Sequence, residues 1–206
     1  ANLLMNLGLE IVHSGDLESG IAEYERAFDA LCRHPEQQRV PELRETLLSQ
    51  FASALLKARR YTDVIRVLES PVAKAYNPTA SLHFALGLAY FRLDRHASAA
   101  VQIKECLAKR HLPTASTINP EIRKSGPYHC LALCLANAGQ LTEAEAAFIA
   151  ALRDESSSRG VRLDLARLYN RMDRPVDALK VLHELIEKRL GDPDVWRLGG
   201  EIALAH

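Results

Sequence analysis

Residues 131–151 read LALCLANAGQLTEAEAAFIAA, and the order of large and small residues in this stretch decides the fold class. A large apolar residue is followed by a small one, and a second large residue comes three positions after the small one. Beyond a glycine, the order continues with a small, a large and a small residue. These positions are Leu131, Ala132, Leu135, Gly139, Ala144, Phe148 and Ala151. Spacings of three and four place side chains on one stripe of a helix, so the stretch predicts two amphipathic helices joined by a short turn.

The same order recurs along the whole chain. The first small residue of each copy is, in turn, Gly8, Ala52, Gly87, Ala132, Ala166 and, in a copy that is only begun, Gly199. Successive copies are therefore 44, 35, 45, 34 and 33 residues apart. The turn between the two helices is expected at Gly15, at Gly139 and within residues 93–95 and 172–174. Because one helix pair cannot bury its own apolar stripe, neighbouring pairs are expected to stack.

This pattern resembles the tetratricopeptide repeat (TPR), whose unit of about 34 residues is two antiparallel helices, A and B. The resemblance covers nearly the whole chain. It implies an all-α fold, a right-handed solenoid of about five helix pairs plus a final single helix. The implied repeats span about 1–34, 45–78, 80–113, 125–158 and 159–191, with a partial repeat at 192–206. The chain begins without Met and ends inside a predicted helix, so we interpret it as a fragment of a longer protein.

Two connections break the regular spacing. They predict irregular insertions at residues 34–44 and 109–125. Pro41 is typical of a helix start, so helix A of repeat two should be lengthened. Pro71 should end helix B of the same repeat early, because proline lacks the backbone N–H that a helix interior needs. The second insertion is rich in turn residues and should hold one helical turn at residues 120–124.

The composition excludes several classes of function. The chain has 26 basic and 26 acidic residues, and this balance argues against a general nucleic-acid or membrane-surface binder. The hydrophobic share of 48% is too high for a disordered chain. The cysteines show no CxxC pair and no secreted-scaffold density, and no stretch is long and apolar enough to span a membrane. The sequence therefore predicts a cytoplasmic protein.

The TPR resemblance also implies where a partner binds, because helix A of each repeat lines the concave surface. Transferred to this chain, the inward positions are Met5, Asn6, Leu9, His13, Ser49, Gln50, Ser53, Leu56, Lys57, Phe84, Ala85, Leu88, Phe91, Arg92, His129, Cys130, Leu133, Ala136, Asn137, Leu163, Asp164, Arg167, Asn170 and Arg171. Ten of them are the predicted partner-binding residues: Phe84, Leu88, Phe91, Arg92, His129, Leu133, Asn137, Arg167, Asn170 and Arg171.

The middle of this predicted groove is apolar. Its apolar strip consists of Phe84, Leu88, Phe91 and Leu133. Such a strip favours a partner segment that is an amphipathic helix or an extended apolar peptide. Cover by another part of the parent chain is an equal alternative. TPR proteins that hold chaperone C-termini use Lys, Asn and Arg at fixed positions of three consecutive repeats, and no three repeats here supply that set.

A basic stripe near repeat five has two open interpretations. It consists of Arg167, Asn170 and Arg171, with Arg162 and Arg174 nearby. The stripe either receives an acidic peptide or a phosphate, or it is a solvated face paired with acidic neighbours.

His129, Cys130 and Cys134 suggest a metal or nucleophile site, because thiolates and imidazoles bind zinc or attack carbonyls. Structural zinc needs four ligands, and the sequence shows no second cluster. Neighbouring residues on a helix also point about 100° apart. Core packing is therefore favoured, and we predict no metal, no cofactor and no catalytic residue.

A second resemblance concerns residues 118–134, INPEIRKSGPYHCLALC, and the ending DVWRLGGEIALAH. Together they look like the TPR region of bacterial proteins that carry a family 2 glycosyltransferase domain. The main hypothesis is a protein-interaction scaffold. The alternative is an accessory, docking or oligomerisation domain of a larger enzyme such as a bacterial glycosyltransferase. The final helix should expose a stripe of Val195, Leu198 and Ile202, which would permit self-association.

Overall fold

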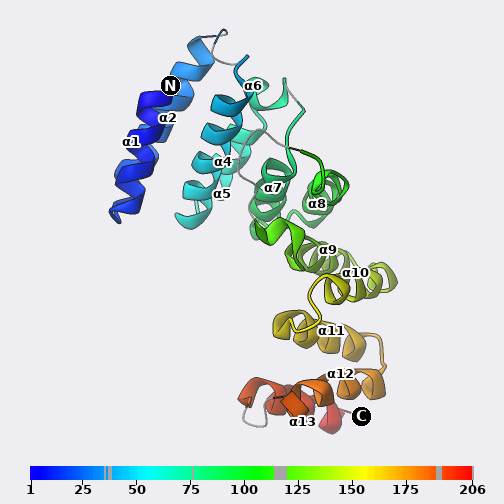
Figure 1. The fold of residues 1–206 in the computed structure, drawn as a ribbon. Coiled ribbons are helices and arrows are strands. Elements are labelled where there is room, and N and C mark those ends of the chain that lie inside the picture. The colour runs from blue at the N-terminus through cyan, green and yellow to red at the C-terminus, as the bar shows by residue number, and fades with distance from the viewer. Residues whose placement is uncertain (35, 37–38, 76, 114–119, 189–191, 206) are drawn as a thin grey trace. The chain divides into compact units, whose positions relative to one another are not determined.

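The computed structural model describes residues 1–34, 36, 39–75, 77–113, 120–188 and 192–205. Within these ranges it contains twelve α-helices, one short 3-10 helix and no strand (Figure 1). The predicted all-α repeat fold is confirmed. The chain divides into two compact units, Ala1–Ile122 and Arg123–His206, which we call unit 1 and unit 2.

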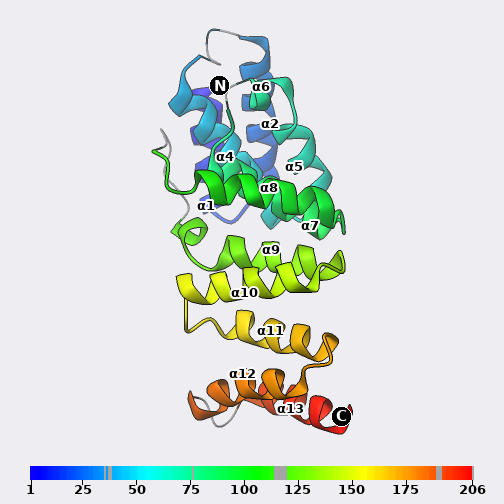
Figure 2. The same cartoon turned by 90° about the vertical axis from the view of Figure 1, so that its right-hand side faces the viewer.

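Unit 1 holds three antiparallel helix pairs. They are α1 (Asn2–His13) with α2 (Leu17–Arg33), α4 (Pro41–Lys57) with α5 (Tyr61–Leu68), and α7 (Ala80–Arg92) with α8 (His96–Lys109). A short helix, α6 (Pro71–Lys74), follows α5, and the 3-10 helix η1 (Pro120–Arg123) follows α8 in the sequence. Helix α2 packs on α4, and α5 packs on α7, so the first two B helices of unit 1 also cover the A helix that follows them (Figures 1 and 2).

Unit 2 holds two helix pairs and a single last helix. They are α9 (Gly126–Asn137) with α10 (Leu141–Asp154), α11 (Arg159–Arg171) with α12 (Pro175–Lys188), and α13 (Pro193–Ala205). The same stacking rule applies, since α10 contacts α11 and α12 contacts α13 (Figure 2). The predicted number of five pairs and a final helix therefore matches the described helices.

The irregular repeat two follows the predictions from its prolines. Helix α4 begins at Pro41 and spans 17 residues, which makes it the longest A helix described. Helix α5 ends at Leu68, and Pro71 starts the separate helix α6, whose N-cap Ser70 accepts a hydrogen bond from the N–H of Ala73. In the second insertion, η1 supplies the predicted helical turn. Residues 35, 37–38 and 114–119 of the two insertions lie outside the described residues.

The turn between helices A and B is alike in all five described pairs. One residue of each turn has a positive φ: Gly15 (101°), Arg59 (58°), Asp94 (56°), Gly139 (80°) and Asp173 (58°). The N–H of the following residue donates to a carbonyl five positions earlier, as from Arg174 to Tyr169 at 2.9 Å. This hydrogen bond is the one that closes a helix in the Schellman motif. Three of these turns, at Arg59, Asp94 and Asp173, hold the positive φ without a glycine.

Small residues are required where helices A and B of one pair cross. A Cβ atom on Gly87 would lie 2.5 Å from Cδ1 of Ile103. The contact is closest at Gly20, where a Cβ would lie 2.4 Å from Cγ2 of Val12 and 3.0 Å from the carbonyl oxygen of Gly8. The recurring small positions of the sequence therefore set the distance between the two helices.

We expect Gly20→Ala to lower the free energy of unfolding by about 1–3 kcal/mol, because the added methyl overpacks the α1–α2 crossing. Urea denaturation followed by far-UV circular dichroism measures this change. Gly200→Ala is the matched control, since no atom lies within 4 Å of a Cβ placed there and alanine favours a helix by about 0.5–1 kcal/mol. Equal stabilisation by both substitutions would show that the crossing is looser than described.

The predicted exposed stripe on the last helix is wrong. Val195, Leu198 and Ile202 are 0%, 7% and 0% exposed, because they form the face of α13 that packs on α12. Arg159 of α11 also connects to the start of α13 by donating to the carboxylates of Asp192 (2.8 Å) and Asp194 (2.7 Å). Self-association through this stripe therefore loses its basis.

The described helices also bear on membrane insertion. None of them combines the length and the apolar character that crossing a bilayer requires.

Candidate functional site

The A-helix surface of unit 1 carries two neighbouring hollows. One, of about 270 Å³, is lined from α1 and α4 by residues that include Leu9, His13, Gln50 and Lys57. The other, of about 90 Å³, lies between α4 and α7 and is lined by residues that include Leu56, Phe84, Ala85 and Leu88. Ser49 and Ser53 line both hollows, so inward positions of three A helices meet on one face of unit 1.

The four predicted residues on α7 differ in their surroundings. Phe84 is half-buried and packs against a buried cluster that includes Cys106 and Ile122. Leu88 is also half-buried and lines the smaller hollow. The ring of Phe91 lies 5.7 Å from that of His96, and Arg92 is exposed. The side chains of Phe84 and Phe91 are thus partly packed against the protein and partly accessible to a partner.

The A-helix surface of unit 2 has one hollow of about 210 Å³, between α9, α10 and α11. Its apolar lining comes from Leu133, Phe148 and Leu168. Its polar lining comes from Asn137, Asp164, Arg167 and Arg171. Leu133 is half-buried, while Asn137, Arg167 and Arg171 are exposed, so the hollow has an apolar floor and a polar rim that is rich in arginine.

Asp164 organises the polar side of this hollow. His129 Nε2 lies 2.8 Å from its Oδ2, and Arg167 donates to its Oδ1 at 2.6 Å. Burial opposes ionisation of this carboxyl, but the hydrogen bonds from His129 and Arg167 outweigh it and lower the pKa of Asp164. The ring of His129 also rests on Phe148, with centroids 5.8 Å apart. His129 therefore connects α9 to α10 and α11.

Only part of the predicted basic stripe borders the hollow. Arg171 is exposed and donates one hydrogen bond to the carbonyl of Ala136 at 2.9 Å, which uses one of the five N–H donors of its guanidinium. Arg162 is buried and bonds to Glu184, so it belongs to the packing of α11 on α12.

Arg174 and Asn170 have other surroundings. Arg174 lies over the ring of Tyr169, 4.6 Å from its centroid, and pairs with Asp177 and Glu145. Asn170 is half-buried and is not among the residues that line the hollow. Asp164 is one of the expected inward positions but not one of the ten predicted binding residues, although it bonds to His129 and Arg167.

Some transferred inward positions are core residues instead. Met5, Cys130 and Leu163 are 5%, 6% and 5% exposed. Conversely, Ile122 lines the smaller hollow of unit 1 although it lies in an insertion. The expected inward positions are defined only within helix A of each repeat. Ile122 lies outside the repeats, so its place in the hollow is known only from the structure.

The cysteines and histidines form no metal site within the described ranges, where no group of three or more His, Cys, Asp or Glu side chains is placed to hold an ion. Cys106, Cys130 and Cys134 are buried and form no disulfide. Burial of Cys130 and Cys134 on α9 agrees with the packing interpretation, because a nucleophile needs access to its substrate.

Comparison with known families gives two matches. Both are to models described as tetratricopeptide repeat, over residues 50–103 and 135–202, and together they cover more than half of the chain. A search of curated proteins gives no match. Neither family match supports the resemblance to the TPR region of proteins that carry a glycosyltransferase domain.

Several solved structures resemble this chain in fold. MamA from Desulfovibrio magneticus RS-1, from its residue 41 to its end, has a TM-score of 0.73 and 17% identity, with 93% of this chain and 96% of that chain covered. A tetratricopeptide repeat protein from Parabacteroides merdae has a TM-score of 0.75 and 15% identity, with 98% and 72% covered. YrrB, described as a TPR protein with an unusual peptide-binding site, has a TM-score of 0.72 and 16% identity, with 94% and 89% covered. At these identities the likeness shows the fold alone.

Proposed function

Since the chain belongs to the tetratricopeptide-repeat family, we propose that it is a protein-interaction scaffold whose A-helix surfaces bind a segment of a partner protein. The observation that carries this proposal is the hollow of unit 2, where an apolar floor is bordered by two exposed arginines. The description of YrrB as a TPR protein with a peptide-binding site supports this proposal.

The chemistry of the unit 2 hollow selects its ligand. Leu133, Phe148 and Leu168 offer an apolar floor for one aliphatic or aromatic side chain. Arg167 and Arg171 stand at the rim, and arginine pairs well with carboxylates through two parallel hydrogen bonds. The best ligand is therefore a segment in which an apolar residue stands beside Asp or Glu.

The unit 1 surface offers a different environment. Phe84 and Leu88 supply an apolar patch, while Ser49 and Ser53 supply hydroxyl groups between the two hollows. Hydroxyl groups both donate and accept hydrogen bonds, so they suit the backbone of an extended segment. Each unit thus carries its own partner surface, and Phe84, Leu88, Phe91 and Arg92 belong to the first.

Charge reversal at the unit 2 rim tests the proposal. A displayed peptide library is selected on the wild-type chain, and the enriched peptides are synthesised and titrated by fluorescence anisotropy. We expect enrichment of an apolar residue next to Asp or Glu. Arg171→Glu should weaken these peptides at least about tenfold, because a favourable charge contact becomes a repulsive one, and the loss should shrink at high salt.

Arg153→Glu is the matched control, because Arg153 is exposed on the B helix α10 and does not line the hollow. It should leave the affinity of the selected peptides within about twofold. Selection of no peptide, or equal binding to Arg171→Glu and wild type, would overturn the proposed unit 2 surface.

A further inference from the structure

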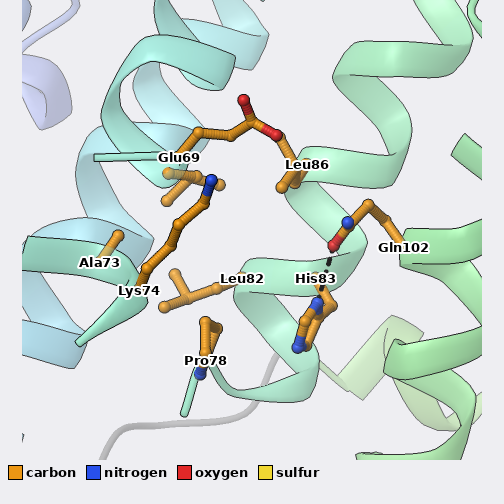
Figure 3. Close-up of a pocket in the computed structure, with 9 residues that line it drawn as sticks. Glu69, Ala73, Lys74, Pro78, Leu82, His83, Leu86 and Gln102 are labelled. Atoms are coloured by element: carbon orange, nitrogen blue, oxygen red, sulfur yellow. Dashed lines mark hydrogen bonds between the residues drawn. The ribbon is translucent and has the colours of Figure 1, made fainter. Parts of the chain in front are cut away.

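A separate pocket exists because helix B of repeat two is short. Helix α5 has 8 residues, whereas the other B helices have 14 or 17. The chain leaves the helix at Leu68, and the last turns of an ordinary helix B are missing. Where those turns would cover α7, Leu82 and Leu86 instead line a pocket of about 280 Å³, which Ala73 of α6 and Pro78 also line (Figure 3).

The pocket is distinct from the A-helix surface of unit 1. Residues two apart on a helix are separated by about 200° around its axis. Leu82 and Leu86 therefore lie on a different face of α7 from Phe84 and Leu88, and the pocket shares no lining residue with the two hollows. A ligand in the pocket would not compete with a ligand on the A-helix surface.

The hydrogen bonds around His83 fix the polar groups of one wall. Lys109 Nζ, which can only donate, lies 2.9 Å from His83 Nε2, so Nε2 accepts. The proton of this imidazole is then on Nδ1, which donates to Gln102 Oε1 at 2.8 Å. Burial, with the Lys109 charge nearby, lowers the pKa of His83 and keeps the ring neutral near pH 7. The side-chain carbonyl of Gln102 thus accepts a hydrogen bond from His83, while its NH₂ group has no partner within the described residues.

The opposite wall carries an acceptor and a cation. Tyr90 donates its hydroxyl proton to Glu69 Oε1 at 2.5 Å, and burial together with this carboxylate raises the pKa of Tyr90 to about 12. The second oxygen of Glu69 has no partner in the described part of the chain. Lys74, on α6, reaches toward Glu69 across the mouth of the pocket (Figure 3). The mouth therefore offers one acceptor on Glu69 and donors on Lys74 and Gln102.

We propose that this pocket is a second docking site, which takes one large apolar side chain of an extended partner peptide. The backbone N–H beside that side chain would donate to Glu69, and the backbone C=O would accept from Gln102 or Lys74. The opposite charges of Glu69 and Lys74 sum to zero, and such a pair complements the dipole of a peptide group better than a net charge would. The volume of about 280 Å³ is just below the range of about 300–1,000 Å³ for small-molecule sites, so it suits one side chain rather than a cofactor.

Short capped amino acids test this site without a known partner. N-acetyl-leucinamide carries the apolar anchor and two peptide groups, and N-acetyl-alaninamide lacks the anchor. In titrations followed by NMR, the leucine probe should shift the methyl signals of Ala73, Leu82 and Leu86 and the side-chain amide of Gln102. The alanine probe should bind at least about fivefold more weakly, because it buries about three fewer carbon atoms.

Two variants connect the shifts to the pocket. Ala73→Leu should fill the pocket and weaken the leucine probe at least about tenfold, and Ala108→Leu, at an exposed site of α8, should leave binding unchanged. Glu69→Gln keeps an oxygen for Tyr90 but replaces the free acceptor by a donor, so it should weaken the probe about fivefold. This second variant keeps the test valid if Ala73→Leu disturbs folding, which circular dichroism would show.

Three results would overturn the proposal. One is the absence of shifts at these residues with the leucine probe. Another is equal binding to wild type and Glu69→Gln. The third is equal binding of the leucine and alanine probes, which would show that the pocket does not take a large apolar side chain.

Discussion

Phe51→Ala is expected to lower the free energy of unfolding of unit 1 by about 3–5 kcal/mol. Phe51 is fully buried on α4, and its ring centroid lies 6.0 Å from that of Tyr24 and 6.1 Å from that of Phe28. These two rings belong to α2, so the substitution removes the contact by which pair one packs on pair two. Far-UV circular dichroism in urea measures the loss.

Phe91→Ala is the matched control for this prediction. The same side chain is removed, but Phe91 is only half-buried on the A-helix surface. Its loss should cost about 1 kcal/mol. Trp196 is the single tryptophan and lies on α13, so its fluorescence reports on unit 2 while circular dichroism reports on the whole chain. Equal costs for the two phenylalanines would contradict the division into core and surface.

Leu198→Glu is expected to detach α13 from α12. Leu198 is 7% exposed between Val195 and Ile202, so an unpaired carboxylate there would be buried. An uncompensated buried charge costs about 3–5 kcal/mol, and a terminal helix escapes that cost by leaving its partner. Amide protection in α13 should fall at least about 100-fold, which corresponds to about 2.8 kcal/mol. Hydrogen exchange and the emission of Trp196 measure this.

Leu204→Glu is the control, because Leu204 is 92% exposed on the same helix. It should leave the protection of α13 within about threefold of the wild type, since surface substitutions usually change stability by less than about 0.5 kcal/mol. If Leu198→Glu instead kept α13 protected and only reduced association between molecules, the stripe would be an exposed surface after all.

The sequence by itself determined the helix pairs, because their signals are local. Spacings of three and four define each apolar stripe, and small residues such as Gly20 and Gly87 reflect direct contact between the two helices of one pair. Pro41 and Pro71 fix the ends of α4 and α5 through the missing proline N–H. All of these features depend on residues within one repeat, so a repeated pattern is enough to find them.

Tertiary structure decided which surface each stripe faces and which polar groups meet. Val195, Leu198 and Ile202 have the same pattern whether a preceding or a following helix covers them, and only the packing of α13 on α12 shows that the preceding one does. Asp164 bonds to His129, 35 positions away, and no local spacing encodes that pairing. The pocket beside α5 is likewise invisible in the sequence, because Pro71 tells where helix B ends but only the folded neighbours show what its missing turns leave uncovered.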